Sequence, residues 1–236
     1  MSKARFSPAS RARLTDHDLE RFPASTLFDR IGRAVCQAGC LPRKELYEAW
    51  EMARRVRRLF RGGRIVDLGA GHGLLAQVLL LLDDSSPSAV VVDKALPPST
   101  AKVHDALVAV WPRLAGRVEF LSQPMEGLEI SAGARRLQPS DLVVSSHACG
   151  RLSDVVIDRA LSARARVAVL PCCHDLDACD TGELDGWIDG ALAVDVMRAA
   201  RLRQQGYRVW TLSIPAEITP KNRLLLGEPH KVTPSE

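Results

Sequence analysis

The chain has 236 residues, 46% apolar and 25% charged, which is typical of one globular domain with a sizeable core. Its formal net charge of +4 permits an anionic partner such as RNA but is too small to require one. Its apolar runs are far shorter than the roughly 20 residues of a membrane helix. The six cysteines lack a disulfide-scaffold spacing. We therefore expect no membrane span and a reducing, cytoplasmic location.

The elements expected in chain order alternate between strand and helix. The polar residues 1–24 predict a poorly ordered tail, and residues 25–60 a helical extension, because apolar side chains recur at helical spacing in "LPRKELYEAWEMARRVRRLF". Strand-like runs then follow, namely "RIVDLG", "SAVVVD", "RVEFL", "DLVVSS", "RVAVLP", "YRVWTLSIP" and "RLLLGEP". Helices are expected near 72–83, 99–111, 127–136, 151–163 and 183–205.

This alternation predicts an α/β domain over residues 61–229. Right-handed crossovers would give a Rossmann-like, seven-stranded, mostly parallel sheet with helices on both faces. The last two strands are separated only by a short "ITPKN" segment, which predicts an antiparallel hairpin at one edge. Residues 230–236 are expected to form a tail.

A glycine-rich turn, "VDLGAGHGLLA", joins the first strand to the helix after it. Gly69, Gly71 and Gly73 allow a tight turn and the close approach of a ligand. The nicotinamide-dinucleotide motif G-x-G-x-x-G, counted from Gly69, would place its third glycine at position 74, where this chain has Leu74. Asp67, near the strand end, would repel a pyrophosphate but attract the ammonium of an amino-acid group. The turn therefore favours S-adenosylmethionine over a dinucleotide.

A second acidic residue, Asp93, ends the next strand, where a carboxylate can accept both ribose hydroxyls of a nucleoside. The alternative is that Asp67 caps the turn and Asp93 is a solvated strand end. With these motifs, residues 60–229 resemble the class I S-adenosylmethionine-dependent methyltransferases. That family often has an acidic residue after the third strand, where this chain has Gln123 and Met125. The resemblance implies these cofactor contacts: Asp67, Gly69, Ala70, Gly71, Gly73, Asp93, Lys94, Gln123, Met125 and Ser146.

Two loops, "HACG" (147–150) and "PCCH" (171–174), follow the fourth and fifth strands. Ligands of a doubly wound sheet lie beyond the carboxyl ends of its strands, so both loops should border the transferred methyl group. Methyl transfer depends chiefly on alignment, and a base is needed only where the acceptor loses a proton. Histidine suits that task at neutral pH, which makes His147 and His174 candidates.

Three interpretations of the cysteine and histidine cluster remain open. One is a zinc site, although adjacent cysteines rarely bind one ion well and no C-x-x-C pair is present. Its candidate ligands are Cys149, Cys172, Cys173, His174 and Cys179. Another is a thiolate nucleophile that relays the methyl group. The third, which we expect, has the cysteines as small, weakly polar side chains that shape the pocket, with no bound metal.

The pair of "HACG" with "PCCH" is similar to a narrower group of methyltransferases. This group includes the tRNA acceptor-stem 2′-O-methyltransferases and the methyltransferase domain of a glutathione-S-transferase-C-terminal-domain-containing protein. The tRNA enzymes have a basic residue at the position of Ser146, and they carry zinc modules that are not evident here. The acceptor therefore stays open between tRNA ribose, protein and small molecule. The resemblance implies an active site lined by His147, Cys149, Gly150, Cys172, Cys173 and His174.

Residues 54–64 contain six arginines that could hold the phosphates of RNA. The alternative is an exposed helix on which Glu51 pairs with Arg54 and Arg55. Our first hypothesis is an S-adenosylmethionine-dependent methyltransferase. The competing hypotheses are a non-catalytic RNA-binding protein that retains the fold and, less favoured, a nicotinamide-dependent oxidoreductase.

Overall fold

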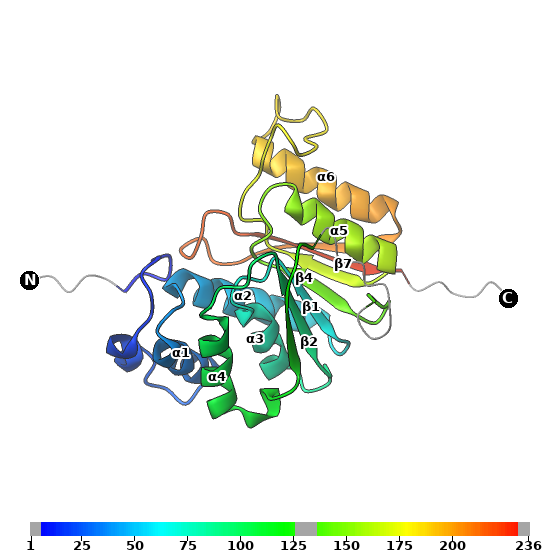
Figure 1. Cartoon of the computed structure of the whole chain (residues 1–236). Coiled ribbons are helices and arrows are strands. Elements are labelled where there is room, and N and C mark those ends of the chain that lie inside the picture. The colour runs from blue at the N-terminus through cyan, green and yellow to red at the C-terminus, as the bar shows by residue number, and fades with distance from the viewer. Residues whose placement is uncertain (1–5, 126–135, 231–236) are drawn as a thin grey trace, which may run out of the picture.

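The computed structural model describes residues 6–125 and 136–230, which form a seven-stranded sheet in the order β3-β2-β1-β4-β5-β7-β6 (Figure 1). The first five strands run parallel to one another, and β7 runs antiparallel to both β5 and β6. The predicted mostly parallel sheet with a terminal hairpin is confirmed. The strands are β1 (Ile65–Leu68), β2 (Ala89–Asp93), β3 (Val118–Ser122), β4 (Leu142–Ser145), β5 (Arg166–Val169), β6 (Tyr207–Ser213) and β7 (Arg223–Pro229).

Helices cover both faces of the sheet (Figure 1). Successive side chains of a strand point to opposite faces, and those of β1 and β4 are all buried, so both faces need a cover. Val66 and Val143 pack in the core beneath α5 (Leu152–Ala163) and α6 (Gly190–Gln204). Ile65 and Val144 pack in the core beneath α2 (Arg43–Leu59) and α3 (Leu74–Leu82). The helix expected at 127–136 falls almost entirely outside the described residues. The helices after β1 are α3 (Leu74–Leu82), α4 (Thr100–Val110), α5 (Leu152–Ala163) and α6 (Gly190–Gln204), with a short 3-10 helix, η2, at Pro112–Leu114.

The N-terminal region differs from the expected tail. Its elements are the 3-10 helix η1 (Asp16–Arg21), α1 (Leu27–Ala38) and α2 (Arg43–Leu59). Leu14 and Phe22 are 0% and 1% exposed, and both belong to the same core as α3. The ring of Phe22 lies so close to α1 that a Cβ on Gly32 would collide with it. Residues 6–24 are therefore anchored at these two points, because both apolar side chains are buried against the helices that follow.

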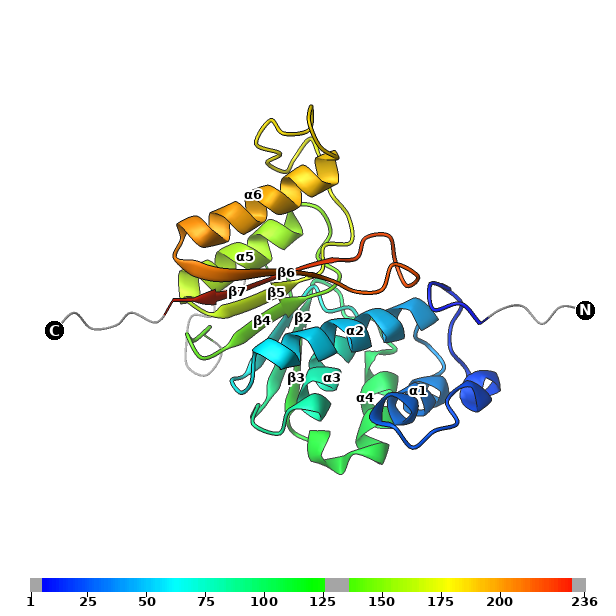
Figure 2. The ribbon, with the colours of Figure 1, turned by 180° about the vertical axis from the view of Figure 1, so that it is seen from behind.

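The C-terminal hairpin and α2 lie side by side when the molecule is viewed from behind (Figure 2). The Arg55 Nε donates a hydrogen bond of 2.6 Å to the carbonyl of Ser213, which joins α2 to the end of β6. The N-terminal helices are thus built into the face of the sheet. Of the helices in residues 6–125 and 136–230, none is long and apolar enough to cross a membrane.

Candidate functional site

The glycine turn between β1 and α3 has three residues in the left-handed region, with φ of +64° at Gly69, +54° at Gly71 and +69° at Gly73. A side chain in this region costs about 1–2 kcal/mol, so the turn depends on glycine. A Cβ on Gly73 would also lie 2.8 Å from a methyl of Val91. A Cβ on Gly71 would meet nothing closer than the His147 ring at 3.9 Å. The backbone at Gly71 is therefore open to a ligand.

Asp67 lies beneath this turn with a fully buried carboxyl group. Its Oδ2 accepts a 3.3 Å hydrogen bond from the backbone N–H of Ala76, and its Oδ1 has no partner among the described residues. Burial, and to a smaller extent the charge of Asp93, raise the pKa of Asp67 to about 8. A cationic group bound over the turn would stabilise the ionised carboxylate, since opposite charges attract strongly where water is excluded.

Asp93 anchors the turn to the end of β2. Its Oδ2 accepts a hydrogen bond of 2.9 Å from the Gly71 N–H, and its Oδ1 accepts one of 3.1 Å from the Ala95 N–H. It is therefore more than a solvated strand end. Because a carboxylate has about four acceptor positions, these bonds leave capacity for ligand hydroxyls. The neighbouring Lys94 is exposed.

The loops after β3 and β4 meet the same turn. Met125 is 6% exposed, and its Cε is 3.0 Å from the position of a Cβ on Gly69. Gln123 donates its backbone N–H to the carbonyl of Asp93 at 2.8 Å. Ser146 is buried, and His147 is half-buried beside Gly71. The structure thus brings the sequence-predicted residues of four strand ends to one place.

A contact that the sequence did not indicate links the turn to the N-terminal helices. The His72 Nε2 lies 3.0 Å from the Ser99 hydroxyl, and its Nδ1 lies 3.5 Å from a carboxylate oxygen of Glu45 on α2. Residues 45 and 72 are adjacent only after folding. The extension therefore supports the turn directly.

His174 is held by α6. Its side chain is 2% exposed, and its Nε2 lies 2.8 Å from Asp195 Oδ1. Its Nδ1 is buried and has no hydrogen-bond partner in the described parts of the chain. This ring therefore has one nitrogen engaged and the other enclosed, whereas His147 is at the glycine turn.

Charged side chains of α6 fasten both loops. Arg198, 2% exposed, donates to both carboxylate oxygens of Asp154 at 2.8 Å and to the Gly150 carbonyl at 2.9 Å. Asp195 also accepts a 2.7 Å bond from Arg223. Burial alone would raise the pKa of Asp195, but the bonds from His174 and Arg223 outweigh it and lower the pKa. No local motif marks these residues, because they are separated from the loops along the chain.

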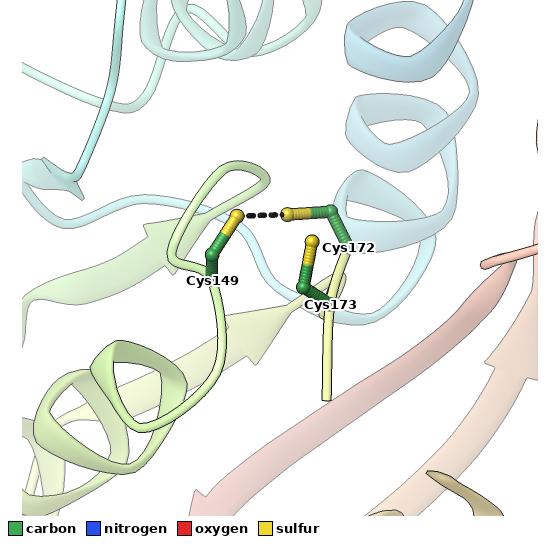
Figure 3. A group of neighbouring side chains, drawn as sticks. All are labelled: Cys149, Cys172 and Cys173. Atoms are coloured by element: carbon green, nitrogen blue, oxygen red, sulfur yellow. Dashed lines mark hydrogen bonds between the residues drawn. The ribbon is translucent and has the colours of Figure 1, made fainter. Parts of the chain in front are cut away.

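The cysteines of the two loops converge (Figure 3). The sulfurs of Cys149 and Cys172 are 2.6 Å apart, and the three sulfurs of Cys149, Cys172 and Cys173 lie within 4.8 Å of one another. Cys179 is separate, since its sulfur lies 3.7 Å from Asp154. Burial raises the pKa of Cys149 and of Cys172. An adjoining cavity of about 400 Å³ is lined by Cys149, Gly150, Arg151, Leu152, Cys173, His174 and Asp175.

Most of the six arginines between 54 and 64 bind groups of the chain itself. Arg54 and Arg55 pair with Glu51, as the alternative interpretation expected. Arg57 is 3% exposed and pairs with Asp83 at 3.1 Å, and burial lowers its pKa to about 10. The remaining pairs are Arg61 with Asp83 at 3.8 Å and Arg64 with Asp141 at 2.6 Å. These contacts weaken the case for a dedicated phosphate patch.

The chain is similar in fold to proteins of known structure. A search of curated proteins found no match. An O-methyltransferase family protein from Burkholderia thailandensis is similar over 94% of this chain and 65% of its own, with 19% identity and a TM-score of 0.52. Mitomycin 7-O-methyltransferase is similar over 93% of this chain and 64% of its own, with 18% identity and a TM-score of 0.49.

A proposed RNA methyltransferase from Pyrococcus horikoshii is similar over 76% of this chain and 80% of its own, with 14% identity and a TM-score of 0.46. This chain thus spans less than two thirds of each O-methyltransferase, and at these identities the likeness shows the fold alone. Residues 44–178, more than half of the chain, match a family model described as a methyltransferase domain. This matched region includes the glycine turn and the buried Asp67 beneath it. Because the match covers more than half of its residues, the chain belongs to that family of methyltransferase domains.

Proposed function

We propose that this methyltransferase uses S-adenosylmethionine, bound over the glycine turn at the carboxyl ends of β1 and β2. The observation that carries the proposal is the fully buried carboxyl of Asp67, one of whose oxygens has no partner in the described structure. It lies under a turn whose backbone at Gly71 is open to a ligand. A buried acid without a cation is costly, and the cofactor's ammonium would supply that cation.

The residues present fit this cofactor. Asp93 would accept the ribose hydroxyls while it holds the Gly71 N–H, and Met125 would border the cofactor from its position over Gly69. When bound, S-adenosylmethionine supplies a methyl group on a positively charged sulfur that is open to in-line attack. The chain's own contribution is then to align the acceptor with that methyl group.

His147 is the residue that we propose to take a proton from the acceptor. It is half-buried and lies against the glycine turn, where the methyl group would be delivered. The Ser145 hydroxyl accepts the Ala148 N–H at 3.2 Å, and Ser153 donates to the Ala148 carbonyl at 2.7 Å, so the loop that carries His147 is fixed. A base is useful when the acceptor is a hydroxyl, so we propose a hydroxyl acceptor.

Cofactor binding is tested by calorimetry with S-adenosylhomocysteine. We expect one binding site per chain, and a loss of at least tenfold in affinity on Asp67→Ala, since a paired charge contributes about 1.4 kcal/mol or more. Asp177→Asn is the matched control, because Asp177 is exposed and should leave binding unchanged. Absence of binding by the folded wild-type chain would refute the proposal.

The acceptor class is tested with labelled cofactor and an extract from cells that lack the gene. Label in RNA that resists alkaline cleavage would identify a ribose hydroxyl, and label in the protein or small-molecule fraction would identify the other classes. The competing proposal of a non-catalytic RNA-binding protein predicts no label and an RNA affinity that survives Asp67→Ala. His147→Ala should lower kcat and leave the affinity for S-adenosylhomocysteine within about threefold, as a base acts on the chemical step.

A further inference from the structure

Three thiols face one another at the end of the sheet where the loops after β4 and β5 meet (Figure 3). We propose that Cys149, Cys172 and Cys173 bind one thiophilic metal cation, Zn²⁺ or Cu⁺. The cation would have three sulfur ligands and one coordination position open to the adjoining cavity. This site does not depend on the use of S-adenosylmethionine.

The distances suit such a cation. Zinc binds thiolates at about 2.3 Å, so sulfurs around one tetrahedral ion lie about 3.8 Å apart. The three sulfurs are already within 4.8 Å of one another, and the pair Cys149 and Cys172, at 2.6 Å, must open by about 1.2 Å to reach that spacing. The adjacency of residues 172 and 173 is not an obstacle here, because the sulfur of Cys172 points toward that of Cys149 and the sulfur of Cys173 lies close to both (Figure 3).

The backbone that carries the thiols is fixed by contacts outside the cluster. The Gly150 N–H donates to the Cys173 carbonyl at 3.1 Å, which ties one loop to the other. The buried Arg198 holds the Gly150 carbonyl, and His174 next to Cys173 is held by Asp195. Supporting bonds of this kind orient the ligands of metal sites and raise their affinity. The convergence is thus a property of the fold.

A metal accounts for the cluster better than an oxidised cysteine pair. A disulfide between Cys149 and Cys172 would leave the third sulfur, that of Cys173, without a partner in the cluster, whereas one cation binds all three. Binding of a cation instead drives the protons off. Each of three S–H bonds is exchanged for a sulfur–metal bond, three protons pass to the buffer, and no electron is transferred.

The open position follows from the exposure of the ligands. Cys149 and Cys173 are both exposed, and both line the cavity of about 400 Å³. Structural zinc sites are closed by four protein ligands, whereas catalytic ones keep three and leave a position for water or substrate. His174 and Cys179 do not complete the set, since the first is directed to Asp195 and the second lies beside Asp154.

The test is metal binding by the full chain, purified with a non-thiol reductant and stripped of metal. Zn²⁺ is titrated against a chromophoric chelator, and Cu⁺ against a copper(I) chelator, so that the two ions are distinguished. Co²⁺ absorption then reports thiolate ligands directly. We expect one equivalent of one ion and a thiolate-to-cobalt charge-transfer band. Cys149→Ser should weaken binding by at least 10-fold, since even outer contacts of metal sites contribute about 10- to 100-fold.

Cys40→Ser is the matched control, because Cys40 is a free, partly buried thiol that lies near the Ser99 carbonyl and outside the cluster. The Cys40→Ser variant should have the same metal affinity and the same cobalt spectrum as the wild type. Cys173→Ser, at an exposed position, repeats the test should Cys149→Ser fail to fold. Binding below one equivalent, or binding that both cluster variants leave unchanged, would overturn the proposal. Neither readout needs the cofactor, so failure here leaves the proposed methyl transfer intact.

Discussion

Replacement of Asp67 by asparagine should stabilise the free protein and abolish cofactor binding. The carboxyl is fully buried, has one partner and has a pKa raised to about 8. In the unfolded chain an aspartate ionises near pH 3.9. The folded state therefore retains a proton that the unfolded state has lost, and stability falls as the pH rises from about 4 to about 8.

The size of this effect follows from the pKa difference. One pKa unit corresponds to about 1.4 kcal/mol, so about three units between pH 3.9 and pH 7 cost the wild type about 4 kcal/mol. The Asp67→Asn variant would carry no such cost, but its buried amide would lack partners, at about 1–3 kcal/mol. We expect a net gain of about 1–3 kcal/mol at pH 7. For a chain of this size, each kcal/mol of added stability raises the Tm by roughly 2–4 °C.

The assay is urea unfolding of both proteins between about pH 5 and about pH 9.5, with and without S-adenosylhomocysteine. The difference in unfolding free energy between variant and wild type should grow by about 1.4 kcal/mol per pH unit and level off above pH 8. At a ligand concentration of 100 Kd, the wild type should gain about 2.7 kcal/mol and Asp67→Asn nothing. A difference that is independent of pH would show that the carboxyl is not held protonated, and would refute this reasoning.

Two further predictions use matched positions. Gly71→Ala and Gly116→Ala both place a side chain at positive φ, with no heavy atom closer than 3.9 Å. Each variant should therefore lose about 1–2 kcal/mol of stability. Calorimetry should show that only Gly71→Ala loses the binding of S-adenosylhomocysteine. Arg57→Met breaks the buried pair with Asp83 and should cost about 3–5 kcal/mol in urea unfolding. The exposed Arg58→Ala should change stability by less than about 0.5 kcal/mol, and an equal loss in both variants would contradict the structural role of Arg57.

Local patterns in the sequence were sufficient for the sheet and the glycine turn. Strands buried on both faces appear as continuous apolar runs, so β1, β4 and β5 were predictable, and the short "ITPKN" segment limited β6 and β7 to a hairpin. The pattern also predicted that Asp67 and Asp93 would lie at neighbouring strand ends. It missed the packing of Leu14 and Phe22, which are isolated apolar residues in a polar segment and produce no periodicity.

By itself, the sequence determined the fold, the glycine turn and the two loops that follow β4 and β5, because these depend on residues close together in the chain. The tertiary structure alone decided which side chains meet. His174 pairs with Asp195, whereas His147 lies beside the glycine turn. Arg57 is buried in an ion pair with Asp83, and Cys179 lies apart from the three thiols that converge. Such contacts join residues tens of positions apart, and their partners are fixed by helix packing and burial rather than by any local pattern.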